Sequence, residues 1–195
     1  MSDAPKDSIA AMFGECAAAH QRFAVYGVES VIRAADAIRG ALASRHKILA
    51  FGNGGSASDA EHFVAELVGR FDGERHGLPA VALTAHSGIM TAVANDYGYE
   101  RVFSRQIEAL GLPGDIALGI STSGRSPNIV AALAAARSRG LITIALTGRD
   151  GGPAGAAADI HVNVAEPATP RIQEVHRTIL HAICQLVDQA VRGQG

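Results

Sequence analysis

Two loops in this sequence combine small residues with hydroxyl side chains, a composition suited to holding a phosphate group. The first loop runs from Gly52 to Ser58 (GNGGSAS) and the second from Ser121 to Pro127 (STSGRSP). Each follows an apolar run and precedes a helical pattern, so backbone N–H groups at a helix start would lie beside Ser and Thr hydroxyls. Neither loop has the P-loop sequence or the dinucleotide-binding G-x-G-x-x-G spacing. One such loop can be only a tight turn, but two of them favour a phosphorylated small molecule as ligand.

A histidine and a glutamate follow the first loop on the same predicted helix. His62 and Glu66 are four residues apart and therefore share one helix face. The apolar residues of this segment centre on the opposite face. The pair is either simply exposed to solvent or directed into a cleft or toward another subunit.

The last helical segment carries polar residues beside its apolar stripe. Gln173 and His181 lie off the stripe and could face a polar site, whereas His176 lies at its edge and is interpreted as structural. On a regular helix Gln173 and His181 are about 12 Å apart along the axis, too far to hold one small ion together. Either the start of this helix is irregular or two chains contribute. We prefer an oligomer with active sites at subunit interfaces.

The elements that must position these residues alternate between strands and helices. Short apolar runs predict five buried strands, and helical periodicity fills most of the sequence between and around them. This alternation predicts an α/β fold in which helices cover both faces of a parallel sheet. The predicted strands are 47–51, 78–83, 116–120, 141–146 and 160–164, and the predicted helices are two within 7–43, then 59–71, helical segments within 88–110, 127–139 and 171–191.

Length and composition limit the class of protein. With 195 residues, 48% of them hydrophobic, the chain is expected to form a single domain over residues 1–195. The net charge of −2 and the absence of a Lys/Arg block argue against nucleic acid or an anionic membrane as partner. No apolar run reaches the length of a membrane span and no signal peptide is recognisable, so a cytoplasmic location is expected. Cys16 and Cys184 lie in apolar helical segments and are interpreted as buried free thiols.

Four segments together resemble a known family. They are the segment GNGGSASDAEHFVAELVGRF (52–71), ANDYG (94–98), GISTSG (119–124) and RIQEVH (171–176). In this order and spacing they are similar to the bacterial phosphoheptose isomerases, within the SIS (sugar isomerase) fold. The resemblance covers nearly the whole chain.

The resemblance implies a fold, an assembly and a set of site residues. The fold would be a three-layer, flavodoxin-like parallel sheet of about five strands, assembled as a homotetramer in which the N-terminal helices (about 7–43) pack. The activity would convert sedoheptulose 7-phosphate to glycero-manno-heptose 7-phosphate, the first step toward nucleotide-activated heptose for surface glycans. One zinc ion per subunit would be held by His62, Glu66, Gln173 and His181. The substrate-binding residues would be Asn53, Gly54, Gly55, Ser56, Glu66, Asn95, Asp96, Ser121, Thr122, Ser123, Ser126 and Gln173.

The implied reaction moves a carbonyl between two carbons and needs an acid and a base. An enediol intermediate allows this, with Glu66 as the base and His181 as the second proton carrier. A carboxylate bound to zinc is a weaker base than a free one, so the metal either polarises the substrate or only orders the site.

Two features qualify the resemblance. A related non-catalytic SIS-domain protein binds the replication initiator DnaA, and this is the alternative function. That group lacks counterparts of Glu66 and His181, both of which are present here. The segment Thr84–Ser87 (TAHS) also departs from the family, in which an Asp commonly follows the Thr. His86 could reach the cleft or remain on the surface.

Overall fold

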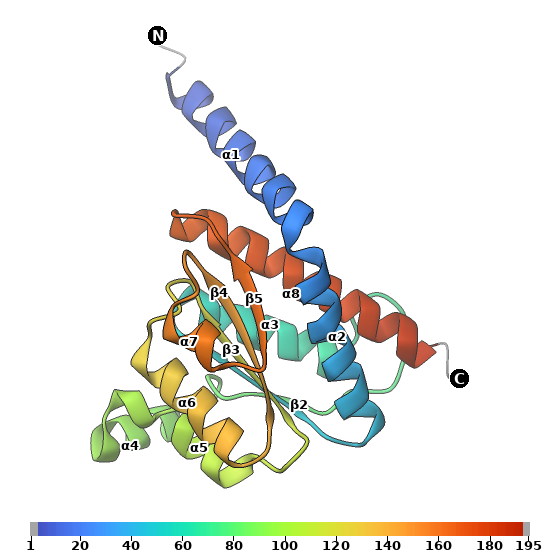
Figure 1. Ribbon diagram of the computed structural model, residues 1–195, viewed down its shortest axis with the longest axis vertical. Helices are drawn as coiled ribbons and strands as arrows, with labels where there is room; N and C mark the ends of the chain where they lie inside the picture. Colours follow the sequence, from blue (N-terminus) through green and yellow to red (C-terminus); the bar gives the residue numbers. More distant parts are fainter. Residues whose placement is uncertain (1–3, 193–195) are drawn as a thin grey trace.

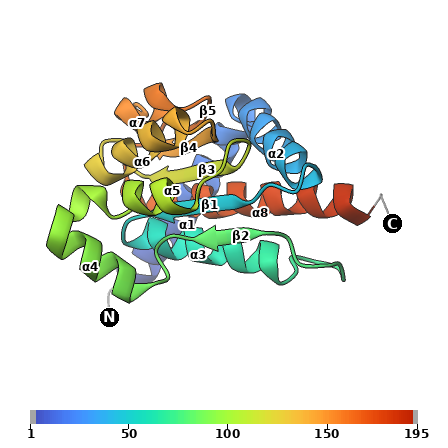
Figure 2. The same ribbon diagram turned by 90° about the horizontal axis from the view of Figure 1, so that it is seen from below.

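The computed structural model describes residues 4–192, and its centre is a five-stranded sheet (Figures 1 and 2). All pairs of neighbouring strands are parallel, in the order β2-β1-β3-β4-β5. This order is that of flavodoxin-like sheets and confirms the fold class expected from the sequence. The strands are β1 (Ile48–Gly52), β2 (Ala80–Ala82), β3 (Ile116–Ser121), β4 (Ile142–Gly148) and β5 (Ile160–Val164).

Helices cover both faces of the sheet. Residues of α2, α3 and α8 form one hydrophobic core with the sheet, and residues of α5, α6 and α7 form a second core on the other face. The helices are α1 (Ala4–Tyr26), α2 (Val28–Ala43), α3 (Gly55–Val68), α4 (Ser87–Tyr97), α5 (Ser104–Leu110), α6 (Pro127–Ser138), α7 (Gly152–Ala157) and α8 (Thr169–Arg192), with a 3-10 helix η1 (Tyr99–Arg101).

The two cores explain why the strands read as continuous apolar runs. Successive side chains of a strand point to opposite faces. In β1, Ile48 and Ala50 enter the first core, and Leu49 and Phe51 enter the second. Every residue of β1 and β3 is buried. A parallel sheet covered on both faces therefore shows no alternation of apolar and polar residues.

The sequence-based prediction misplaced one helix start and missed one helix. Helix α3 begins at Gly55, four residues before the predicted start at Asp59. Gly54 has φ +57°, a conformation that glycine adopts readily, so the chain turns into the helix within the glycine loop. Helix α7 was not predicted, because its sequence GPAGAA carries no helical apolar period.

The N-terminal helix α1 extends beyond the rest of the domain (Figure 1). Ala19 and Phe23 are its buried residues, whereas Phe13 is 74% exposed. Packing of α1 and α2 in an oligomer stays a prediction. None of the helices within residues 4–192 is both long enough and apolar enough to cross a membrane.

Candidate active site

The two glycine- and serine-rich loops lie side by side at the carboxyl edge of the sheet. The first follows β1 and the second follows β3, and these strands are hydrogen-bonded neighbours. Strands β2 and β3 flank β1 on its two sides, so the strand order reverses here. Open α/β sheets bind their ligands at such a switch point. The topology thus brings together the two loops that the sequence suggested for phosphate.

A pair of amide side chains joins the first loop to the start of α6, directly after the second loop. Asn53 and Asn128 donate to one another, with both N–O distances 2.9 Å, and Asn128 is buried near the start of α6. The Tyr99 hydroxyl also donates to Asn53 Oδ1 at 3.1 Å. These bonds fix the first loop against α6 and leave its backbone at the open edge of the sheet.

The second loop presents hydroxyl groups at the same edge. Ser121 Oγ and Ser126 Oγ are 3.2 Å apart, and Thr122 and Ser123 between them are half-buried. Ser56, at the start of α3, is buried. Among the described residues, no side chain caps the start of α3 or α6. Two helix starts and several hydroxyls are therefore available to an anion.

Helices α3 and α8 run side by side and bring a row of polar residues together. The Gln173 amide lies against Gly55, Arg177 pairs with Asp59, and His181 meets His62. The three contacts follow one another in the same order along both helices, so the helices are parallel. We call this row the α3–α8 seam; its members are Gly55, Asp59, His62 and Glu66 of α3 with Gln173, Arg177 and His181 of α8.

The reactive end of the seam contains His62, Glu66 and His181. The Nε2 atoms of the two histidines are 2.9 Å apart, so one ring donates a hydrogen bond to the other. Glu66 Oε1 is 3.4 Å from His62 Nε2, and the Glu66 side chain is 22% exposed. Burial lowers the pKa of His181, and the neighbouring His62 and Arg177 lower it further. A carboxylate and two imidazoles thus share a partly open site.

Gln173 does not join this group. Its side chain lies at the Gly55 end of the seam, and α8 is helical from Thr169 onward. The helix start is therefore regular, which leaves a contribution from two chains as the remaining way to bring Gln173 and His181 to one ion.

Asn95 and Asp96 lie at the end of α4 and are exposed. Asn95 donates to Asp96 Oδ1 at 2.9 Å. Within residues 4–192, no hydrogen bond joins either residue to the two loops, although nearby Tyr99 does reach Asn53.

The donor atoms at the reactive end suit a zinc ion in type and spacing. Two ligand atoms of a tetrahedral zinc site are about 3.3 Å apart, because each lies roughly 2.05 Å from the metal. The separations of 2.9 and 3.4 Å around His62 Nε2 are close to this value. In the described part of the chain, no three His, Cys, Asp or Glu side chains are already arranged around a common point. The zinc site expected at His62, Glu66 and His181 therefore stays a prediction.

The other histidines and the cysteines fall largely as expected. His176 is fully buried and its Nε2 lies 2.9 Å from the Thr147 carbonyl oxygen, which confirms its structural interpretation. His86 is exposed at the start of α4. Both cysteines are free; Cys184 is buried and Cys16 is half-buried.

Sequence reasoning missed several residues around the site. Asp59 and Arg177 could have been found, because each lies at helical spacing between two residues already singled out. Asn128 and Tyr99 carry no such signal, and neither does Arg75, whose contacts at the end of α3 are described below.

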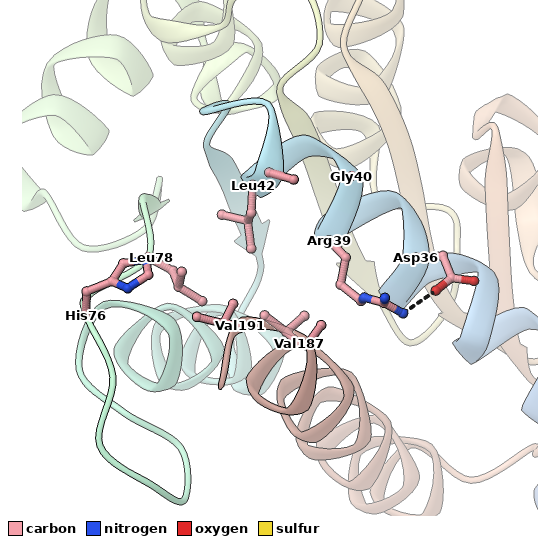
Figure 3. Close-up of a pocket in the computed structure, with 10 residues that line it drawn as sticks. Asp36, Arg39, Gly40, Leu42, His76, Leu78, Val187 and Val191 are labelled. Carbon is pink, nitrogen blue, oxygen red and sulfur yellow. Dashed lines mark hydrogen bonds and ion pairs between the residues drawn. The ribbon is translucent and has the colours of Figure 1, made fainter. Parts of the chain in front are cut away.

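A cavity of about 580 Å³ lies elsewhere, between the C-terminal parts of α2 and α8 and the segment before β2 (Figure 3). None of the predicted site residues lines it. Its charged residues Asp36 and Arg39 bond to each other at 2.9 Å and are about half exposed. His76 also lines the cavity, but among the described contacts its ring bonds to neither of them. The chemistry of this fold is therefore better placed at the seam and the loops.

Comparison with known proteins agrees with this fold. The family model of the SIS domain matches residues 13–148, from α1 to the end of β4. A phosphoheptose isomerase of Halorhodospira halophila is 55% identical over 166 residues, which are 84% of each chain.

Two solved structures of phosphoheptose isomerases are also similar. That from Neisseria gonorrhoeae has a TM-score of 0.90 and 45% identity, covering 94% of this chain and 98% of its own. That from Francisella tularensis has a TM-score of 0.92 and 37% identity, covering 97% and 100%. The chain belongs to the phosphoheptose isomerases, within the SIS-domain family.

Proposed function

We propose that this chain isomerises D-sedoheptulose 7-phosphate to D-glycero-D-manno-heptose 7-phosphate through an enediol. The observation that carries the proposal is the α3–α8 seam, in which Glu66 and His181 both adjoin His62. His62 and Glu66 lie on α3, the helix that starts at the phosphate-type loop. The reaction would serve as the first step toward nucleotide-activated heptose for surface glycans, in the cytoplasm.

The proposed mechanism moves two protons. Glu66 removes a proton from C1 of the ketose while His181 donates one to O2, which gives the enediol. Glu66 then returns its proton to C2 as His181 takes the proton from O1, and the C1 carbonyl forms. The loops after β1 and β3 would hold the phosphate, through the backbone at Asn53, Gly54 and Gly55 and through the hydroxyls of Ser56, Ser121, Thr122, Ser123 and Ser126. Asn95 and Asp96 would bind the sugar from the end of α4.

We also propose a zinc ion, held by His62, Glu66 and His181 with Gln173 as a further ligand. When bound, it would polarise the carbonyl oxygen of the substrate. The donor types and the two ligand spacings support it. Native mass spectrometry before and after dialysis against a chelator should show loss of one zinc per subunit, and a His62→Ala variant should not regain it.

A homotetramer with active sites at subunit interfaces is the proposed assembly. The exposed apolar residues of α1 support it, since large apolar surfaces on a soluble protein commonly mark contacts. The separation of Gln173 from His181 supports a site shared between chains. Light scattering during size-exclusion chromatography gives the mass directly, and a monomer would contradict the proposal.

The test of the proposed function is turnover of sedoheptulose 7-phosphate by the purified, zinc-supplemented protein. Glu66→Gln and His181→Ala should each lower kcat by about 10²- to 10⁴-fold, the range for a general acid or base. Glu61→Gln and His86→Ala are matched controls, because both residues are exposed outside the seam. No turnover by folded wild-type protein would contradict the assignment.

The DnaA-binding alternative is not favoured. The relatives described above are phosphoheptose isomerases, and a binding protein has no need of a carboxylate and two imidazoles in contact.

A further inference from the structure

The guanidinium group of Arg75 is buried at the C-terminal end of α3. Its side chain is 2% exposed, and each of its nitrogens has a partner. Nε donates to Asp188 Oδ1 at 2.6 Å, and Nη2 donates to the Glu66 carbonyl oxygen at 2.7 Å. Nη1 donates to the carbonyl oxygens of Leu67 and His76, both at 2.9 Å. Arg75 thus bonds the backbone of Glu66 directly.

These bonds complete a helix end that backbone donors close only in part: the Gly69 N–H donates to the Ala65 carbonyl oxygen and the Leu78 N–H to the Leu67 carbonyl oxygen. The last four carbonyls of an α-helix lack partners within the helix. Gly69, which follows α3, has φ −79° and so does not take the left-handed conformation that commonly closes a helix. The Arg75 guanidinium donates hydrogen bonds to carbonyl oxygens at this helix end, and its positive charge lies favourably at the negative end of the helix dipole. Among the described bonds, the donor to the Glu66 carbonyl oxygen is Arg75, so the place of Glu66 in the last turn of α3 depends on Arg75.

The same guanidinium ties this turn to α8. Asp188 is 4% exposed and lies seven residues after His181, two turns away on the same face of α8. Arg75 therefore bridges the helix that carries Glu66 and the helix that carries His181. The bridge thus ties α3 to α8 next to the reactive end of the seam.

We infer that Arg75 is a positioning residue, which holds Glu66 at its working distance from His62 and His181. The inference rests on the proposed function, because it concerns the residue assigned there as base. All three of its side-chain nitrogens already have protein partners, so it would act through the backbone of Glu66.

Arg192 offers a matched control. It donates to the other oxygen of Asp188, Oδ2, at 3.2 Å, and its side chain is 40% exposed. Among the described contacts, it bonds no carbonyl of α3. Replacing Arg192 removes a cation from the same carboxylate and leaves the helix end closed.

The experiment compares Arg75→Lys and Arg192→Met with the wild type. A lysine can bond Asp188 or a carbonyl but cannot span both helices. Misplacement of a catalytic group by about 1 Å can cost roughly 100-fold, so we expect Arg75→Lys to lower kcat by about 10- to 100-fold with KM within about twofold. Arg192→Met should keep the wild-type kcat. If Arg75→Lys does not fold, Asp188→Asn, which keeps the helix cap and removes the negative charge from the bridge to α8, should lower kcat with KM unchanged.

Hydrogen exchange of the amides in residues 62–70 gives a second readout that needs no turnover. Exchange should be faster in Arg75→Lys and unchanged in Arg192→Met. A wild-type kcat in the folded Arg75→Lys protein, or an equal loss in Arg192→Met, would overturn the inference. If the wild type itself turns over no heptose phosphate, the proposed function fails, and unchanged exchange in Arg75→Lys would then overturn the positioning role separately.

Discussion

The buried His176 should make the stability of this protein fall in mild acid. Its side chain is fully buried, and its Nε2 donates to the Thr147 carbonyl oxygen, which leaves Nδ1 without a partner among the described residues. A second proton would have to enter at Nδ1 and bring an uncompensated charge into the core. Burial therefore lowers the pKa of His176 to about 4, from an ordinary value of 6.5.

The size of the effect follows from the difference between the folded and unfolded pKa. The unfolded chain binds the proton first, so the stability contributed by neutral His176 is complete above about pH 6.5 and is lost as the pH falls toward 4. Each pKa unit corresponds to about 1.4 kcal/mol, which gives about 3 kcal/mol in total and about 2 kcal/mol already lost at pH 5.

Urea unfolding at pH 7 and pH 5, at fixed protein concentration, measures this loss. His176→Gln can still donate to Thr147 but cannot titrate, so its free energy of unfolding should fall by about 2 kcal/mol less than that of the wild type. Taking this difference cancels the contributions of the other histidines. His86→Gln is the matched control for removing an exposed histidine. Equal pH dependence in wild type and His176→Gln would refute the reasoning.

Two further predictions concern the loops and the seam. Gly124→Ala should raise KM for the sugar phosphate and cost about 1–3 kcal/mol of stability. The reason is that Gly124 has φ +63° and that an added Cβ would collide with the Gly151 carbonyl oxygen. Gly88→Ala is the control, because Gly88 is an exposed helical residue with open space around it, and this change should not destabilise the fold. Arg177→Met should cost about 2 kcal/mol in urea unfolding, because it leaves the buried Asp59 carboxylate without its cation, and Asp59→Asn in the same chain should recover part of the loss. Unchanged stability in Arg177→Met would contradict this account.

Most of the fold could be predicted because its signals are local. The five strands are apolar runs, and each is bounded by turn residues, so length and composition were enough to find them. The phosphate-type loops were found for the same reason, since β1 and β3 end directly before them. The sheet then brought the two loops together, as the switch-point rule requires.

The parts that could not be predicted depend on contacts between distant segments. Arg75 and Asp188 are 113 residues apart, and nothing in either local sequence indicates the bond. The helix predicted over 59–71 begins earlier, at Gly55, and the Asp59 carboxylate lies within it and pairs with Arg177 of α8. A residue that is polar and lies near a helix start has several possible partners, and only the packing of the two helices decides among them.

The parallel course of α3 and α8 has an electrostatic consequence. Helices α3, α6 and α8 all begin at the carboxyl edge of the sheet, after β1, β3 and β5. Their macrodipoles therefore point the same way and their partial positive ends repel one another. An anion at this edge would relieve that repulsion. The topology of the fold thus creates an electrostatic potential that attracts phosphate to the two loops. These loops contain no lysine, and their one arginine, Arg125, is in an ion pair with Asp150.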